Sequence, residues 1–267
     1  MNGSGQEIEW ASGDAYEPYV GRWSRLIAHR FLDWLAMPRN LRWLDVGCGT
    51  GALSRTVLGL ASPAEVLGVD PSEGYVAYAR AHVEDERARF DVGNAMGLPY
   101  ESGYFDAVVS GLALNFVPQP ATALSEMVRV TKTGGVTAAY VWDYSGGMQV
   151  IRHFWEAAAM LNPSASELDE GGRFPLCKPE PLRKLFREAG LESIETRAID
   201  EVPAVFQDFD DYWSPFLGGQ GPAPGYAMSL DEGDRAELRE LIRSRLPMEP
   251  DGSICLVAGA WAARGRR

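Results

Sequence analysis

An apolar strand that runs into three alternating glycines limits the possible folds of this chain more than any other feature. Residues 43–46 form a short apolar run that contains Asp45, and Gly47, Gly49 and Gly51 follow before a helix-like segment. Glycine has no Cβ, so such a loop can take positive φ angles and its backbone can approach a bound ligand closely. The pattern predicts a nucleotide-cofactor loop. Its spacing also fits a dinucleotide loop, and an ordinary glycine-rich turn is a further alternative.

A second apolar strand is predicted over residues 65–70, and it ends in Asp70. A carboxylate at the tip of the second strand can accept hydrogen bonds from both hydroxyls of a ribose. The alternative is that Asp70 only caps the helix that begins near Ser72. The ribose interpretation fits more than one class of nucleotide cofactor, so this strand does not choose among them.

The segment from residue 91 to residue 110 separates the two cofactor classes. It contains three short motifs: Gly93-Asn94-Ala95, Leu98-Pro99 and the strand that starts Phe105-Asp106. Together with the glycine loop and Asp70, these motifs resemble the class I S-adenosylmethionine-dependent methyltransferases. The resemblance is to the small-molecule branch, which includes the ubiquinone and menaquinone biosynthesis enzymes. It is tight over residues 40–145 and continues in outline over the rest of the chain.

The resemblance implies a cofactor role for each matching position. The glycine loop lies under the methionine part of S-adenosylmethionine, with Asp45 near the amino group, and Asp70 accepts from the ribose hydroxyls. Asn94 stands where the family usually has an aspartate that accepts from the adenine amino group, and a neutral acceptor makes a weaker hydrogen bond there. The full set of cofactor residues predicted in this way is Arg22, Asp45, Gly47, Gly49, Gly51, Asp70, Pro71, Asn94, Ala95 and Ser110.

Alternating strands and helices predict an α/β fold with a parallel sheet covered on both faces. The expected strands are 41–46, 65–69, 105–110 and 135–142, and the expected helices are 19–36, 52–60, 72–86, 121–131 and 179–189. Two further strands, 191–206 and 254–262, flank a helix over 230–246 that opens on a capping box from Ser229 to Glu232. In the resembled family the last strand enters the sheet antiparallel, and residues 254–261 suit that strand. We therefore expect a Rossmann-like, doubly wound sheet.

The whole chain, residues 1–267, is expected to form one domain, with an N-terminal helical cover over residues 1–37. Residues 143–178 and 206–226 are predicted to be insertions on the substrate side. The second insertion places aromatics, Tyr212 and Trp213 among them, near glycines and prolines, which suits a lid over an apolar pocket. Tyr212 and Trp213 are therefore predicted to contact the acceptor. A small satellite core beneath a long loop is the equal alternative.

Catalytic side chains are few, and the chemistry does not demand many. Methyl transfer from a sulfonium is an in-line displacement, so alignment of the reactants can supply most of the catalysis and a base is optional. His153, which enters the first insertion, is the histidine candidate for a base. We expect no metal, because Asp143 is a single carboxylate near the strand ends and makes a poor magnesium site.

Composition excludes several other classes of protein. The formal net charge is −12 and only three residues are lysine, which opposes binding to a phosphate backbone, so no nucleic-acid partner is expected. The three cysteines are far apart, which argues against a disulfide framework or a zinc site. The N-terminus lacks a basic start and an apolar core, and no long apolar run exists, so we expect a cytoplasmic protein without membrane insertion. The oligomeric state is left open.

These patterns together predict methyl transfer from S-adenosylmethionine to a small, partly apolar acceptor at oxygen, nitrogen or carbon. A nicotinamide-dependent oxidoreductase is the first alternative, but the chain has no Tyr-x-x-x-Lys pair. A noncatalytic protein that binds S-adenosylmethionine without transferring its methyl group is the second. Turnover to S-adenosylhomocysteine distinguishes it from an enzyme.

Overall fold

The computed structural model describes residues 22–200, 202–218 and 221–267, and in these residues seven strands form one twisted sheet. The strand order is β3-β2-β1-β4-β5-β9-β6. Neighbouring strands from β3 to β5 pair in parallel, whereas β9 is antiparallel to both β5 and β6. The strands are β1 (Arg42–Val46), β2 (Glu65–Asp70), β3 (Ala88–Val92), β4 (Phe105–Gly111), β5 (Thr131–Trp142), β6 (Glu192–Ile199) and β9 (Ala260–Arg266). The predicted fold class, a mostly parallel Rossmann-like sheet with an antiparallel C-terminal strand, is confirmed.

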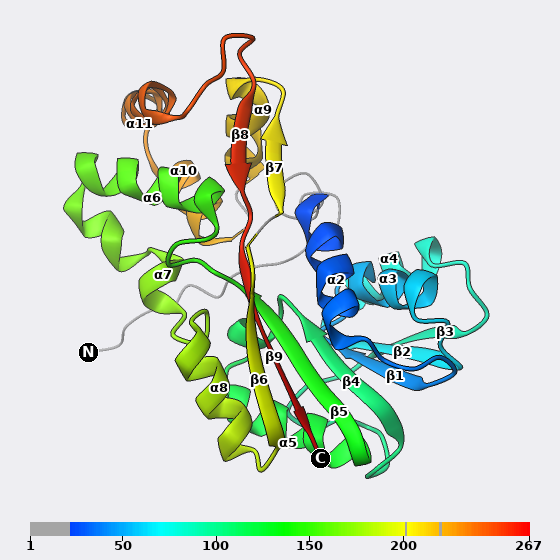
Figure 1. The fold of residues 1–267 in the computed structure, drawn as a ribbon. Coiled ribbons are helices and arrows are strands. Elements are labelled where there is room, and N and C mark those ends of the chain that lie inside the picture. The colour runs from blue at the N-terminus through cyan, green and yellow to red at the C-terminus, as the bar shows by residue number, and fades with distance from the viewer. Residues whose placement is uncertain (1–21, 201, 219–220) are drawn as a thin grey trace.

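Helices cover both faces of the sheet (Figure 1). On one face α2 (Arg22–Leu35) packs against α3 (Ala52–Leu60), with α4 (Glu73–His82) beside them; α5 (Pro120–Val130) and α8 (Pro179–Glu188) pack together on the other. The apolar stripe of α2 explains its position, because Trp23, Ile27 and Phe31 recur at helical spacing and all three are buried. The predicted cover over residues 1–37 is described from residue 22 onward, and its earlier part lies outside the described residues.

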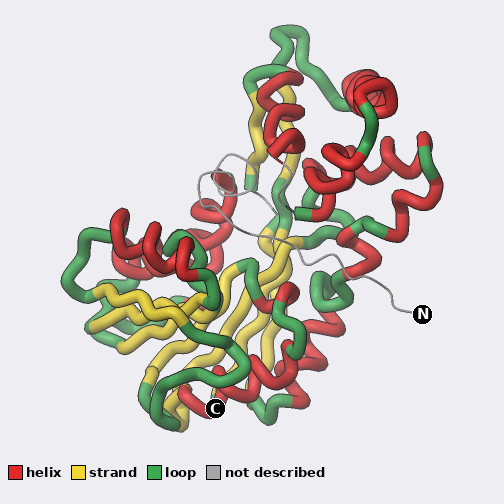
Figure 2. The backbone as a smooth tube through the Cα atoms, turned by 180° about the vertical axis from the view of Figure 1, so that it is seen from behind, coloured by secondary structure: helices red, strands yellow, loops and turns green. Residues whose placement is uncertain are grey.

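The remaining elements form a second layer beyond the carboxyl ends of the parallel strands (Figures 1 and 2). There β7 (Pro203–Phe206) and β8 (Ile254–Val257) make a two-stranded antiparallel sheet. The other elements of this layer are α6 (Gln149–Leu161), η3 (Pro163–Glu167), α7 (Glu170–Arg173), α9 (Phe209–Trp213), η4 (Ser214–Gly218), α10 (Pro222–Ser229) and α11 (Glu232–Arg245). Both predicted insertions contribute to it, although they lie far apart in the sequence. We call this part of the molecule the upper layer.

Two predicted strands are wrong in their extent, because each splits between the two sheets. The strand predicted over 191–206 becomes β6 and β7, and the one predicted over 254–262 becomes β8 and β9. The second break falls at Gly259, whose amide donates to Gly147 O over 2.8 Å and where an added Cβ would lie 2.9 Å from Gly147 Cα. This close backbone crossing turns the chain from one sheet into the other. Consequently the antiparallel strand of the main sheet is 260–266 and not 254–261.

The predicted capping box of α11 is also wrong. The helix begins at Glu232, and the N-cap is Asp231, whose Oδ1 accepts a hydrogen bond from the Asp234 amide over 2.9 Å. Ser229 instead ends α10, and its hydroxyl donates to Tyr226 O. A carboxylate at the N-cap satisfies the same free backbone N–H groups as a serine would. The two signals overlap in the sequence, and only the backbone path decides between them.

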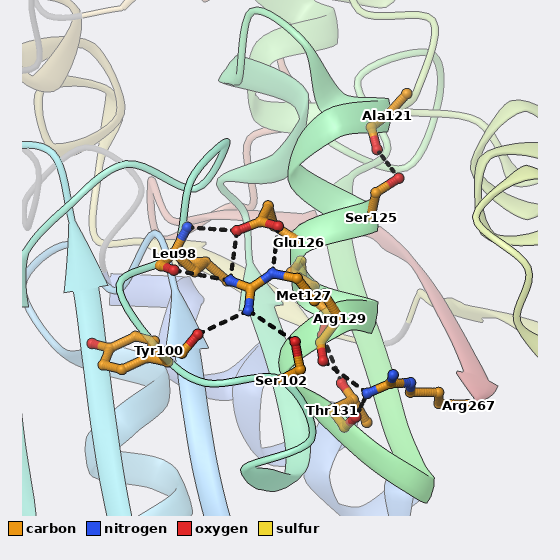
Figure 3. A network of polar contacts seen from close by, with 10 residues as sticks. All are labelled: Leu98, Tyr100, Ser102, Ala121, Ser125, Glu126, Met127, Arg129, Thr131 and Arg267. Atoms are coloured by element: carbon orange, nitrogen blue, oxygen red, sulfur yellow. Dashed lines mark hydrogen bonds and ion pairs between the residues drawn. The ribbon is translucent and has the colours of Figure 1, made fainter.

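A polar network fixes the segment that follows β3 (Figure 3). The Arg129 guanidinium of α5 donates to Leu98 O and Tyr100 O, each over 2.9 Å, and forms a fork on Glu126 over 2.6 and 2.8 Å. Glu126 in turn accepts from the Leu98 amide over 2.8 Å. Because Leu98 lies just after Asn94 and Ala95, the network holds the predicted adenine-binding segment against α5.

Replacing Arg129 with methionine should lower the free energy of unfolding by about 2 kcal/mol, because carbonyl groups and the Glu126 carboxylate lose their donors. The methionine keeps an apolar stem of similar length. Urea unfolding measures the change, and Arg89→Met on β3 is the matched control, since Arg89 is exposed and should cost less than about 0.5 kcal/mol. Equal losses in the two variants would show that the network does not stabilise the fold.

Candidate active site

A cavity of about 510 Å³ lies at the carboxyl ends of β1, β2 and β4, and we call it the sheet-end cavity. It brings together most of the predicted cofactor residues, namely Asp45, Gly47, Gly49, Asp70, Pro71, Asn94, Ala95 and Ser110. Gly51 does not line it but is the N-cap residue of α3 with φ of +84°. The Arg22 side chain lies outside the described residues. In open α/β sheets, ligands bind at this edge.

The glycine loop needs glycine for two different reasons. Gly47 has φ of +75°, and a Cβ there would lie 2.4 Å from the Cβ of Ala113, a distance that van der Waals repulsion forbids. Gly49 also has a positive φ, of +50°, but a Cβ there would meet no atom within 4 Å. The first glycine therefore permits close packing of the loop on the segment after β4. Gly49 is needed only for its positive φ, because a side chain there would enter open space.

Asp45 carries the most informative unsatisfied atom of the site. Its side chain is 1% exposed, and Oδ2 accepts a hydrogen bond from the Ser54 hydroxyl over 2.7 Å. Its Oδ1 is buried and has no hydrogen-bond partner within the described part of the chain. Burial raises the pKa of Asp45 to about 7, and the Ser54 hydrogen bond opposes that shift. A buried carboxylate oxygen of this kind favours a ligand that supplies a cationic N–H donor.

Asp70 stands at the end of β2, as predicted, and its side chain is buried there. It is 8% exposed, Oδ2 accepts from the Gly49 amide over 3.0 Å, and Oδ1 accepts from the Ser72 amide over 2.9 Å. The pKa of Asp70 is raised by burial and lowered by these two amides. The carboxylate thus ties the glycine loop to the start of α4, and each oxygen retains a lone pair for a ribose hydroxyl. The helix cap itself is Ser72, whose hydroxyl accepts from the Tyr75 amide.

Asn94 lies at the rim of the sheet-end cavity with an exposed side chain. Its carbonyl Oδ1 already accepts a hydrogen bond from the Met96 amide over 2.9 Å. The oxygen predicted to receive the adenine amino group is therefore shared with the turn that it stabilises. Such a local side-chain bond is typical of asparagine in turns.

The structure does not bring His153, Tyr212 or Trp213 into the lining of the sheet-end cavity. His153 is half-buried on α6, and burial lowers its pKa, with Glu156 and Arg245 the nearby charges. Tyr212 is fully buried and its hydroxyl donates to Val150 O over 2.8 Å, while Trp213 packs on Phe216. The aromatics of residues 206–226 pack on one another in the upper layer and belong to the same hydrophobic core as the main sheet.

Several residues of the lining carry no recognisable signal in the sequence. Tyr144, Ile151 and Glu170 come from the first insertion, and Pro222 comes from the second. Glu170 is the chemically important member, because it is a carboxyl that is only 1% exposed. In the sequence it ends the run Leu168-Asp169-Glu170, which has the pattern of a solvated acidic turn. Only its burial against Trp155 reveals it.

The ionisable side chains of the described lining are acidic. It contains the carboxyl groups of Asp45, Asp70 and Glu170, and within the described residues no lysine, arginine or histidine joins them. A bound anion would have no positive partner among these side chains. The cavity therefore favours neutral or cationic ligands.

Two further findings concern the residues that the structure describes. They contain no cluster of three or more histidine, cysteine, aspartate or glutamate side chains that could hold a metal ion. None of their helices has both the length and the apolar character needed to cross a bilayer.

Comparison with known proteins relates this site to one family. Residues 44–139 match the family model described as Methyltransferase domain. A 2-methyl-6-phytyl-1,4-hydroquinone methyltransferase from Synechocystis sp. is 31% identical over 187 residues, which are 69% of this chain and 57% of that protein. A demethylmenaquinone methyltransferase from Geobacillus kaustophilus is 32% identical over 175 residues, which are 60% of this chain and 74% of that protein.

The fold has solved counterparts as well. Phosphoethanolamine N-methyltransferase 2 of Haemonchus contortus, solved in complex with S-adenosylmethionine, superposes with a TM-score of 0.60 at 18% identity, covering 95% of this chain and 56% of that one. The chain spans about half the length of several curated relatives, 57%, 40% and 45% in three cases. It belongs to the class I S-adenosylmethionine-dependent methyltransferases. Within them it resembles the small-molecule branch, as the quinone methyltransferases above indicate.

Proposed function

We propose that this protein is an enzyme that transfers the methyl group of S-adenosylmethionine to a small, neutral or cationic acceptor with an apolar body. The observation that carries the proposal is the unpaired Oδ1 of buried Asp45, which lies in the same cavity as the glycine loop and Asp70. The ammonium of the methionine part would satisfy that oxygen. Asp70 would accept from the ribose, with Pro71 beside it, and Asn94, Ala95 and Ser110 would contact the rest of the nucleoside.

The cofactor supplies a methyl group already activated by a sulfonium, so the protein's task is to bind, align and keep the site dry. The upper layer supports this task, because residues of both insertions line the sheet-end cavity above the glycine loop. We propose that residues 143–178 and 206–226 form the substrate side of a single domain. Arg22 remains a predicted partner of the methionine carboxylate.

Hydroquinones are the acceptor class that the relatives favour, since one relative is named for a hydroquinone and another for demethylmenaquinone. The lining supports an aromatic acceptor, because Phe116, Trp142 and Tyr144 offer flat apolar surfaces. An anionic acceptor is disfavoured by the acidic lining. Methylation at oxygen, nitrogen or carbon stays open, and a cytoplasmic location, independence of metals and the lack of a nucleic-acid partner stay predictions.

Binding and turnover test the proposal together. Calorimetric titration should show binding of S-adenosylmethionine and S-adenosylhomocysteine, and no binding of NAD at the same concentrations. Mass spectrometry should then detect S-adenosylhomocysteine when S-adenosylmethionine is supplied with a panel of hydroquinones, phenols and amines. Binding of NAD alone would favour the oxidoreductase alternative. Binding of both sulfur nucleosides without turnover on any acceptor would favour a noncatalytic protein.

A further inference from the structure

Glu170 is a buried carboxyl group outside the predicted set of cofactor residues. It is the first residue of α7, and its position depends on the residue before it. Asp169 caps α7 by accepting from the Gly171 amide over 2.8 Å, and Arg152 of α6 holds Asp169 through two hydrogen bonds of 2.7 Å each. Arg152 also donates to Tyr144 O over 3.0 Å. The Glu170 side chain is thereby fixed inward, into the lining of the sheet-end cavity.

Both insertions place polar groups beside the Glu170 carboxyl group. The indole N–H of Trp155, on α6, donates a hydrogen bond to Oε2, and the backbone amide of Ala223, on α10, helps to lower the pKa of the carboxyl group. A carboxylate offers about four lone-pair sites. Glu170 therefore retains acceptor capacity, and it lines the same cavity as the aromatic side chains of Tyr144 and Phe116.

The surroundings bring the pKa of this carboxyl group close to neutral pH. Burial, with a smaller contribution from the charge of Asp169, raises the pKa of Glu170 to about 7, and the backbone amide of Glu170, the Trp155 indole and the Ala223 amide oppose the shift. Arg152 of α6 is the nearby cation, and the thiol of Cys177 is the other titratable group that interacts with Glu170. A general base works best when its pKa lies near the working pH.

We propose that Glu170 is the general base of the acceptor site and that the acceptor is a phenol or hydroquinone whose hydroxyl donates to this carboxylate. The proposal rests on the proposed function and deepens it. In the reaction, the hydroxyl gives its proton to Glu170 as the methyl group bonds to the acceptor. Attack through oxygen gives the methyl ether. Attack through a ring carbon gives a dienone, which becomes aromatic again when the hydrogen on that carbon moves to oxygen. The bond from that methyl group to sulfur breaks with both electrons left on sulfur. The positive sulfonium and the negative carboxylate both become neutral, so charge balances.

The test uses 1-naphthol as the acceptor probe, added to the full chain saturated with S-adenosylhomocysteine. Calorimetry between pH 6 and pH 8, in two buffers with different heats of ionisation, gives the affinity and the number of protons released. Affinity should rise with pH, because the charged carboxylate accepts the phenolic hydroxyl more strongly than the acid does. At pH 7 binding should release a fraction of a proton, since the bound hydroxyl favours the ionised carboxylate.

Glu170→Gln should weaken 1-naphthol binding at pH 8 by about tenfold or more, because a neutral amide replaces a charged acceptor. In this variant, the affinity for 1-naphthol should no longer depend on pH, and binding should release no protons. Glu167→Gln, an exposed neighbour on η3, is the matched control and should behave as the unmodified protein. Unchanged proton release in Glu170→Gln would overturn the proposal, as would binding of n-hexylamine in place of 1-naphthol. If the unmodified protein did not bind S-adenosylhomocysteine, that result would instead refute the proposed function.

Two further readouts test the pKa of Glu170, and the second of them needs no acceptor. Trp155→Phe removes a donor that favours the ionised carboxylate, so the pH of half-maximal 1-naphthol affinity should move upward. In addition, the pKa of Glu170 is higher in the folded protein than in the unfolded chain, so the protein should lose stability as pH rises from about 4.5 to about 7. The thermal midpoint of the unmodified protein should therefore fall more between pH 5 and pH 8 than that of Glu170→Gln. An equal fall in both proteins would show that Glu170 does not titrate in this range and would count against it as the base.

Discussion

Replacing Gly47 with alanine is expected to lower the free energy of unfolding by about 3 kcal/mol, which combines a left-handed backbone with overpacking. The glycine has φ of +75°, and the new Cβ would lie 2.4 Å from the Cβ of Ala113. The contact involves the backbone-proximal carbon of Ala113, so no flexible side chain can move away to relieve it. Either the loop or the segment after β4 must shift. Urea unfolding of the variant and the unmodified protein measures the loss.

Two other glycines provide matched controls for this prediction. Gly49→Ala introduces a Cβ that meets nothing within 4 Å, so it should cost only about 1 kcal/mol for its positive φ while it weakens S-adenosylhomocysteine binding. Gly59→Ala lies within α3, in open space, and should stabilise the protein by about 0.5 to 1 kcal/mol. If Gly47→Ala were as stable as Gly49→Ala, packing against Ala113 would not be what requires glycine at position 47.

Replacing Asp45 with asparagine should weaken S-adenosylmethionine binding by about a hundredfold, or about 3 kcal/mol, because a buried charge pair with the ligand's ammonium is lost. The fold should survive, since an amide oxygen can still accept from the Ser54 hydroxyl. In the protein without ligand, burial raises the pKa of Asp45 to about 7. The affinity of the unmodified protein should therefore fall as pH drops below 7, whereas the affinity of Asp45→Asn should change little.

The control for Asp45 lies at the other end of the same sheet. Asp106, at the start of β4, accepts from the Arg42 amide and pairs with Lys132 over 2.6 Å, away from the sheet-end cavity. Asp106→Asn should leave S-adenosylmethionine affinity unchanged in calorimetric titration. If Asp45→Asn bound the cofactor as tightly as Asp106→Asn, the unpaired Oδ1 would not be the site of the ammonium, and the assignment of the methionine end would fail.

Much of the lower half of the molecule follows from local patterns. The segments around Asp45, Asp70 and Asn94 lie at the ends of consecutive parallel strands, and the order of such strands brings their carboxyl ends to one edge. Short-range signals also define α8, where Pro179 begins the helix and Gly190, with a positive φ, follows its end. The cofactor half of the site could be predicted because a few consecutive residues encode each part of it.

The acceptor half could not be predicted in this way. His153, Tyr212 and Trp213 were expected near the acceptor because of their residue types, yet they face other parts of the upper layer. Aromatic side chains occur both in hydrophobic cores and in lids, and their spacing along the sequence does not distinguish the two. Glu170 was missed because its partners, Trp155 and Ala223, lie on two different insertions.

The sequence by itself determined the class of fold and the place of the cofactor, because the glycine loop and the strand-end acidic residues act through bonds and turns that are local to each segment. The tertiary structure alone decided which side chains are buried beside the cofactor. It divided two predicted strands at the crossing of Gly147 and Gly259 and turned Glu170 inward through Arg152 and Asp169. These contacts join residues far apart in the chain. Burial and its effect on a carboxyl group depend on such non-local packing, which no short pattern in the sequence encodes.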